Sequence, residues 1–261
     1  FHFNKLPVRR IAMDKQMVFD LVDQNEKVLK DMAVTIWENA EGAFKEKKAS
    51  KLQQNYLAEQ GFKIISVPDL ETAFIAEIGE GKPIAAILGE YDALPGMSQK
   101  ISAVKEEYDV SGFGHGCGHN LLGIGGVGAV IALKVLMEKE NIKGTLRYYG
   151  CPAEETLAGK VLMAKKEVFN DVDVCISWHP ASMNVVWGCS FLALNSMKFR
   201  FKGLSAHAAA APQAGRSALD AVELMNVGAN YLREHVIEKA RIHYIITNGG
   251  LAPNIVPDSA E

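Results

Sequence analysis

The sequence has no long hydrophobic run, no excess of either charge and few cysteines, and each absence excludes a class of protein. We find no stretch of about 18 consecutive apolar residues, so we expect no transmembrane helix. Lys and Arg total 28 against 31 Asp and Glu, a net charge of -3 with neither a basic patch for nucleic acid nor an acidic tail. The four cysteines are irregularly spaced, which favours a reduced, cytoplasmic setting over a disulfide framework.

What remains is the composition of a soluble globular protein with a substantial core. The hydrophobic fraction is 48% and the charged fraction 23%, and 261 residues suffice for one large domain or two modest ones. Residues 1–12 lack the apolar centre of a signal peptide. We interpret them as sequence upstream of a natural start at Met13.

The first two thirds of the chain alternate between helical and strand patterns. This order predicts an α/β fold, with a mainly parallel, mixed sheet sandwiched by helices. The expected helices are 14–39, 45–60, 121–137 and 156–168, and the expected strands are 62–67, 73–78, 83–89, 145–150 and 172–177.

The pattern changes after residue 188. Alternating apolar residues predict a strand over 191–201, followed by a helix over 213–235 and a strand over 241–247. We therefore expect a larger domain over 13–188 and a smaller α+β domain over 189–261.

Three short segments with metal-ligand chemistry each follow an apolar, strand-like run or a glycine-rich loop. They are His115–His119, Pro152–Glu155 and Trp178–Pro180. Together they supply a thiolate, imidazoles and paired carboxylates, a mixture that suits zinc and also admits manganese. Glu90–Pro95, Cys151–Glu155 and Trp178–Pro180 each lie just past a predicted strand end. Because ligands bind beyond the carboxyl ends of parallel strands, we expect the motifs to meet at one sheet edge.

Each segment also has an ordinary structural interpretation. Cys117 and His119 could be a buried thiol and a core histidine in a glycine turn, and His179 a structural histidine. Glu154 and Glu155 could open a helix, where acidic side chains are favoured. In an extended segment, however, the two glutamates point to opposite sides, so one can bind metal while the other moves protons.

Other features have weaker functional interpretations. Gly123–Gly128 matches the dinucleotide-binding pattern but follows no predicted strand, so we interpret it as a glycine-rich helix packed closely on the sheet. Periodicity gives His207 and Asn254 no role, and a surface histidine and a turn residue are the default interpretations.

Several motifs resemble the M20 family of metallopeptidases and amidohydrolases. Gly89–Pro95 is similar to the family's Asp-Ala-Leu-Pro element, Gly114–Asn120 to the ligand loop of its aminoacylase-like branch, and Pro152–Glu155 to its base-and-ligand pair. Asn120 stands where most members of that branch have Asp. This residue and the Gly-His-Gly before the cysteine look closer to the B-type group of aminobenzoyl-glutamate utilisation proteins.

The resemblance implies a hydrolase with two divalent metal ions, zinc or manganese. Glu154 would be the general base, and Asp92 would support the site without contacting the metals. His115 has no assigned role. The implied metal ligands are Cys117, which would bridge the two ions, and His119, Glu155 and His179.

The resemblance also implies that 13–188 is the N-terminal portion of the metal-binding catalytic domain and that 189–261 is part of a lid that pairs protein chains. His207 would reach a neighbouring active site and stabilise the oxyanion, and Asn254 would help bind the substrate. The expected substrate is an N-acyl amino acid, such as an aminobenzoyl-glutamate-like compound. The expected assembly is a homodimer, and a further candidate is pairing with a homologous partner subunit. We expect no nucleic acid or membrane partner.

The family's last metal ligand has no counterpart in this sequence. The family carries a final histidine ligand beyond the lid, and His235 and His243 do not match its context. We therefore expect a truncated product. The alternatives to an active amidohydrolase are a non-catalytic fragment that binds metal or dimerises and, on the glycine pattern, a dinucleotide-binding domain.

Overall fold

The computed structural model describes residues 15–109, 112–188 and 190–261. The chain divides after Asn184 into two compact units. The change of domain that we expected after residue 188 lies close to this division, and the roles assigned to the two parts stay predictions. The expected upstream segment 1–12 and Met13 lie outside the described residues.

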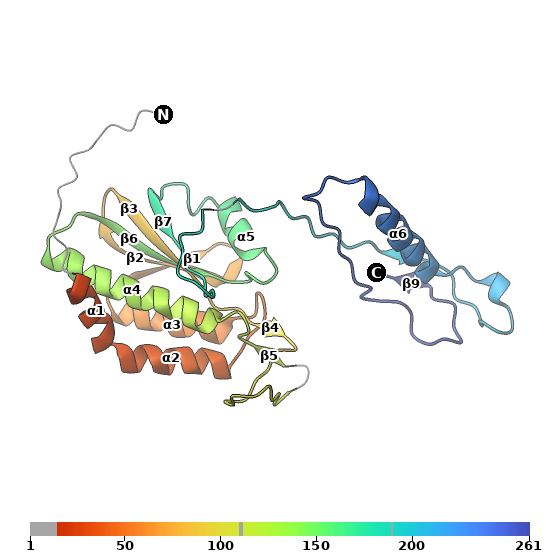
Figure 1. Cartoon of the computed structure of the whole chain (residues 1–261), viewed down its shortest axis with the longest axis horizontal. Helices are drawn as coiled ribbons and strands as arrows, with labels where there is room; N and C mark the ends of the chain where they lie inside the picture. The colour runs from red at the N-terminus through yellow and green to blue at the C-terminus, as the bar shows by residue number, and fades with distance from the viewer. Residues whose placement is uncertain (1–14, 110–111, 189) are drawn as a thin grey trace. The chain divides into compact units, whose positions relative to one another are not determined.

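The first unit contains a five-stranded sheet and five helices among its described residues (Figure 1). The helices are α1 (Lys15–Gln24), α2 (Glu26–Glu38), α3 (Lys47–Glu59), α4 (His119–Lys139) and α5 (Gly159–Lys165). The strands of the sheet are β1 (Lys63–Val67), β2 (Leu70–Glu80), β3 (Ile84–Glu90), β6 (Gly144–Cys151) and β7 (Val174–Ile176). A separate small ribbon pairs β4 (Leu94–Pro95) with β5 (Phe113–Gly114).

The strand order is β1-β2-β6-β3-β7. Strand β3 is parallel to both β6 and β7, whereas β2 is antiparallel to β1 and β6. Strand β2 thus runs against the other four, and the sheet is mixed but mainly parallel, as predicted. The carboxyl ends of β3, β6 and β7 therefore lie at the same edge.

Helices cover both faces of the sheet, because neighbouring residues of each strand point to opposite sides. Phe74 and Tyr148 pack with α2, α3 and α4 in one core cluster. The next residues along, Ile75 and Tyr149, pack in a second cluster with Met163 of α5. This confirms the predicted helix–sheet–helix sandwich.

Helix α4 is the apolar centre of the unit. By length and composition alone it could cross a membrane, since an 18-residue stretch of the helix has a mean hydropathy of 1.8. However, 61% of that stretch is buried inside the structure. Its glycines allow close packing: a Cβ on Gly126 would lie 2.9 Å from the Tyr148 ring, and one on Gly123 would lie 2.6 Å from the Glu90 carbonyl oxygen. The glycine-rich segment therefore has the packing role that we predicted for it.

The second unit has less regular structure than the sequence predicts. It contains β8 (Phe201–Lys202), α6 (Ala218–Leu232) and β9 (Ser259–Ala260), with two short 3-10 turns, η1 (Pro212–Ala214) and η2 (Arg233–His235). The strand predictions for 191–201 and 241–247 are wrong except at Phe201, since the described residues there pair with no strand. An alternating sequence forms a strand only when a neighbouring strand completes its hydrogen bonds.

Two helix predictions also need correction. The expected helix 14–39 is interrupted at Asn25, whose side-chain amide donates to the Leu21 carbonyl oxygen at 2.9 Å. Such a local bond competes with continuation of the helix. Helix α6 starts later than predicted because Ser217 caps it, accepting a hydrogen bond from the Asp220 amide at 3.1 Å.

Candidate metal centre

The three predicted ligand segments meet at one edge of the sheet. Strands β3, β6 and β7 end at Glu90, Cys151 and Ile176, and the loops that follow carry the candidate residues. Helix α4 begins at the same edge with His119. The structure thus brings together the six residues predicted for this site, which are Asp92, Cys117, His119, Glu154, Glu155 and His179.

The His119 ring is fully buried and is oriented by Asp92. Its Nδ1 lies 3.0 Å from the Asp92 carboxylate Oδ1 and 3.0 Å from the Asp92 carbonyl oxygen. Both atoms accept hydrogen bonds, so Nδ1 must carry the proton. The other Asp92 oxygen accepts from the Glu155 amide at 2.9 Å. Burial alone would raise the pKa of Asp92, but the bonds from His119 and Glu155 outweigh burial and lower it.

The opposite nitrogen of His119 faces carboxylates. Its Nε2 lies 3.2 Å from Glu90 Oε2 and 3.7 Å from Glu154 Oε2. With the proton on Nδ1, a neutral ring presents a lone pair to these oxygens, an arrangement that only an added proton or metal cation stabilises. Burial lowers the pKa of His119, but the Asp92 hydrogen bond and the surrounding carboxylates outweigh it and raise the pKa.

Cys117 and His179 lie beside this group. The Cys117 Sγ is 3.1 Å from His179 Nε2, and the ligand atoms of both residues lie within 4.8 Å of one on His119. Gly118, at φ +76°, adopts the left-handed conformation that allows the loop to turn between Cys117 and His119. Burial, together with the charges of Glu155 and Glu154, raises the pKa of the thiol to about 11.

The two adjacent glutamates lie toward different sides of the His119 ring. Glu154 approaches Nε2, whereas Glu155 Oε1 lies 3.9 Å from Nδ1. They lie in a turn that covers 154–157 and not in the extended segment that we expected, so the turn, not strand-like alternation, separates their side chains. Their roles as base and metal ligand stay predictions.

The described residues at this edge fit a divalent metal ion. Three of their buried polar atoms have no hydrogen-bond partner, which is costly in the absence of a cation. The cluster also offers a thiol, two imidazoles and carboxylates, the ligand types that zinc accepts. The three atoms are Glu90 Oε2, His119 Nε2 and Glu155 Oε1.

Two residues at the centre, Glu90 and Lys160, had no role predicted from the sequence. Glu90 accepts a hydrogen bond from Lys160 of α5 through Oε1. Glu90 lies in the segment Glu90–Pro95 that we expected at this edge, so its position was a signal, although only Asp92 of that segment was given a role. Lys160 is 70 residues from Glu90 in the sequence, and no local pattern marked it as a site residue.

A third missed residue, Glu46, supports the loop before the glutamate pair. Its side chain is fully buried, and Oε1 accepts from the amides of Phe44 and Ala153 at 2.8 Å each. Ala153 has φ +54°, an unfavourable left-handed conformation for alanine. Glu46 thus holds in place the strained turn that precedes Glu154. No local pattern links residues so far apart.

His115 contacts α2. Its Nε2 lies 3.3 Å from the Ile36 carbonyl oxygen, and burial lowers its pKa to about 4. The ring is therefore neutral at physiological pH, and its bonded nitrogen points at the backbone of α2.

His207 and Asn254 lie in the second unit and are neighbours there. The Ala208 amide donates to the Asn254 carbonyl oxygen at 3.0 Å. His207 is exposed, and its Nδ1 accepts from the amides of Ala209 and Ala210 at 3.2 and 3.1 Å. Their proposed contributions to a neighbouring active site and to substrate binding stay predictions.

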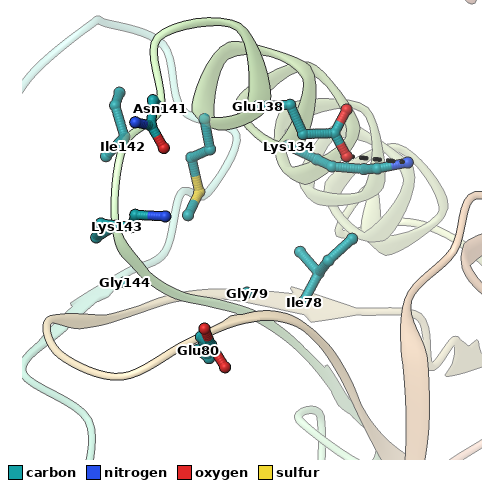
Figure 2. Close-up of a pocket in the computed structure, with 10 residues that line it drawn as sticks. Ile78, Gly79, Glu80, Lys134, Glu138, Asn141, Ile142, Lys143 and Gly144 are labelled. Carbon is teal, nitrogen blue, oxygen red and sulfur yellow. Dashed lines mark ion pairs between the residues drawn. The ribbon is translucent and has the colours of Figure 1, made fainter.

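A hollow at the far end of α4 is distinct from this centre (Figure 2). It lies between the last turns of α4 and the β2 and β6 strands, and a Lys134–Glu138 pair at 3.8 Å lines it. Its lining residues on α4 run from Lys134 to Glu138, so the hollow lies roughly 22–29 Å along the helix from His119.

Comparison with known proteins identifies the class. Residues 86–253 match the model of peptidase family M20/M25/M40, and the chain belongs to this family. It is 44% identical to the B subunit of p-aminobenzoyl-glutamate hydrolase from Escherichia coli (strain K12) over 249 residues, which is 94% of this chain and 52% of the relative. It is 30% identical to the Xaa-Arg dipeptidase of Mus musculus, over 95% of this chain and 56% of the relative. The chain thus spans about half the length of these relatives.

Solved structures share the fold at lower identity. The aminobenzoyl-glutamate utilization protein of Klebsiella pneumoniae matches with a TM-score of 0.57 and 16% identity, covering 93% of this chain and 67% of that one. The YXEP protein of Bacillus subtilis, a dinuclear metal-binding M20 peptidase, matches with a TM-score of 0.53 and 23% identity, covering 95% and 63%.

Proposed function

We propose that this protein is a metal-dependent amidohydrolase that cleaves the amide bond of an N-acyl amino acid. The observation that carries the proposal is the convergence of a thiol, two imidazoles and carboxylates around partnerless buried atoms at one sheet edge. The similarity to one chain of a p-aminobenzoyl-glutamate hydrolase supports an aminobenzoyl-glutamate-like substrate.

The chain's own residues suggest a division of labour. Two divalent ions, zinc or manganese, would polarise the amide carbonyl and acidify a water molecule. Glu154 would take the proton from the attacking water and return it to the leaving amine. Asp92 would keep the His119 ring in its productive tautomer. The residues that would hold the ions are Cys117, His119, Glu155 and His179.

The second unit would serve as a lid in a cytoplasmic homodimer. His207 would stabilise the oxyanion in the partner's active site, and Asn254 would contact the substrate. Since the relatives include both the A and the B subunits of p-aminobenzoyl-glutamate hydrolase from Escherichia coli, a homologous chain is a second candidate partner.

The test is hydrolysis of p-aminobenzoyl-glutamate by the metal-loaded protein, with Glu154→Ala as the critical variant. We expect loss of the general base to lower kcat by about 10²–10⁴-fold while bound metal is retained. The exposed Glu59→Ala serves as the control. Full turnover by Glu154→Ala would contradict the assignment, and metal binding without turnover in wild type would favour the non-catalytic interpretation.

A further inference from the structure

Glu90 is a buried carboxylate whose two oxygens have different surroundings. It is the last residue of β3, and its side chain is 7% exposed. One oxygen, Oε1, accepts from the Lys160 ammonium group. The other, Oε2, has no hydrogen-bond partner among the described residues. Lys160 therefore satisfies half of the carboxylate and leaves the other half directed at the metal centre.

The partnerless oxygen lies where a ligand of the His119 metal would lie. Oε2 is 3.2 Å from His119 Nε2, yet neither atom has a hydrogen-bond partner among the described residues. Ligand atoms on a tetrahedral zinc ion, with bonds of about 2.1 Å, are about 3.4 Å apart. Glu90, His119 and Glu154 can each offer one ligand atom within 4.8 Å of the others.

A purely structural ion pair accounts for only part of this arrangement. The Lys160–Glu90 pair explains why a carboxylate can be buried at the end of β3. It does not explain why the second oxygen faces a histidine nitrogen whose proton is held on the opposite side by Asp92. A cation between Oε2 and Nε2 satisfies both atoms at once.

We propose that Glu90 is a further metal ligand, binding through Oε2 the ion that His119 holds, with Lys160 anchoring Oε1. The inference rests on the proposed metal centre and adds a ligand to it. A further carboxylate oxygen makes the site harder. It therefore favours Mn²⁺ relative to Zn²⁺, because carboxylate ligands suit manganese and thiolates suit zinc.

The test is metal affinity, measured for Mn²⁺ and Zn²⁺ by competition with a chromophoric chelator. Glu90→Gln removes the charge but keeps an oxygen that can accept from Lys160. We expect it to weaken binding by at least about tenfold, the scale of even indirect changes around metal ligands, and more for Mn²⁺ than for Zn²⁺. The Co²⁺-loaded variant should also show an altered visible absorption spectrum, which reports the ligand set. Glu59→Gln, the same change at an exposed position, should alter neither.

Two further variants separate the possible failures. Glu90→Asp keeps the charge but shortens the reach, so a folded Glu90→Asp protein with weakened metal affinity supports ligation. Unchanged affinity and an unchanged Co²⁺ spectrum in Glu90→Gln would overturn this inference alone, provided that His119→Ala weakens metal binding strongly. If His119→Ala also binds metal normally, the proposed metal centre itself fails.

Discussion

The two units of the chain contrast in how completely their apolar residues are buried. In the first unit both sheet faces are covered, and residues such as Phe74 and Tyr148 are fully buried. In the second, the core cluster consists of Ala218, Val222 and Ala260, with Phe201 and Leu219 partly buried against it. Large side chains there, such as Phe191 and Tyr231, are 77% and 75% exposed. The first unit therefore encloses its largest side chains within its own elements, whereas the second leaves several of its largest side chains exposed.

The largest expected effect tests the difference between the two cores. Phe74→Ala removes a fully buried ring from the first unit and should lower its free energy of unfolding by about 3–5 kcal/mol. Val222→Ala in the second unit removes less buried volume and should cost about 1–2 kcal/mol. Hydrogen exchange at increasing denaturant concentration, resolved for each unit, measures the loss of unfolding free energy in both variants. Equal losses would remove the contrast.

The next effect tests whether metal binding belongs to the first unit. His119→Ala deletes a central imidazole and should weaken zinc binding by about 100-fold or more, or about 2.7 kcal/mol. His207→Ala, in the second unit, should leave the affinity within about twofold. Calorimetric titration of both variants with zinc is the measurement. A large loss of zinc affinity in His207→Ala would mean that a metal ligand lies in the second unit, against this account.

Glu46 tests whether the first unit stores strain beside its metal centre. Glu46→Ala leaves the buried Ala153 amide, and the Phe44 amide, without their acceptor and should destabilise the unit by about 1–3 kcal/mol. Glu46→Gln keeps an oxygen that can accept both bonds. It also has no carboxylate charge, the form that burial disfavours when it raises the pKa of Glu46. We therefore expect Glu46→Gln to unfold near the wild-type denaturant concentration, and a loss equal to that of alanine would refute the acceptor role.

The smallest effect is the pH dependence of metal affinity. Metals bind the thiolate, and the pKa of Cys117 is about 11 in the absence of metal. Below that pH, binding must release the thiol proton, so the Cys117 contribution to zinc affinity should rise tenfold per pH unit, about 1.4 kcal/mol. Calorimetry in buffers of different ionisation enthalpy counts the protons. Cys117→Ser should release about one proton fewer, and an unchanged count would exclude Cys117 as a ligand.

The same contrast explains what the sequence could predict. Strands β3 and β6 were predictable because they are apolar runs buried between helices, and the residues after them mark the sheet edge where Asp92 and Glu155 lie. The alternating segment 191–201 misled because alternation specifies a strand only when a partner pairs with it. Contacts between distant segments, Lys160 with Glu90 and Glu46 with Ala153, leave no local pattern.

The most direct test of the metal centre is X-ray absorption spectroscopy of the zinc-loaded protein. The account predicts sulfur at about 2.3 Å from zinc, with nitrogen and oxygen at about 2.0–2.2 Å, and loss of the sulfur signal in Cys117→Ser. A zinc spectrum without sulfur, or a purified protein that binds no zinc, would contradict it.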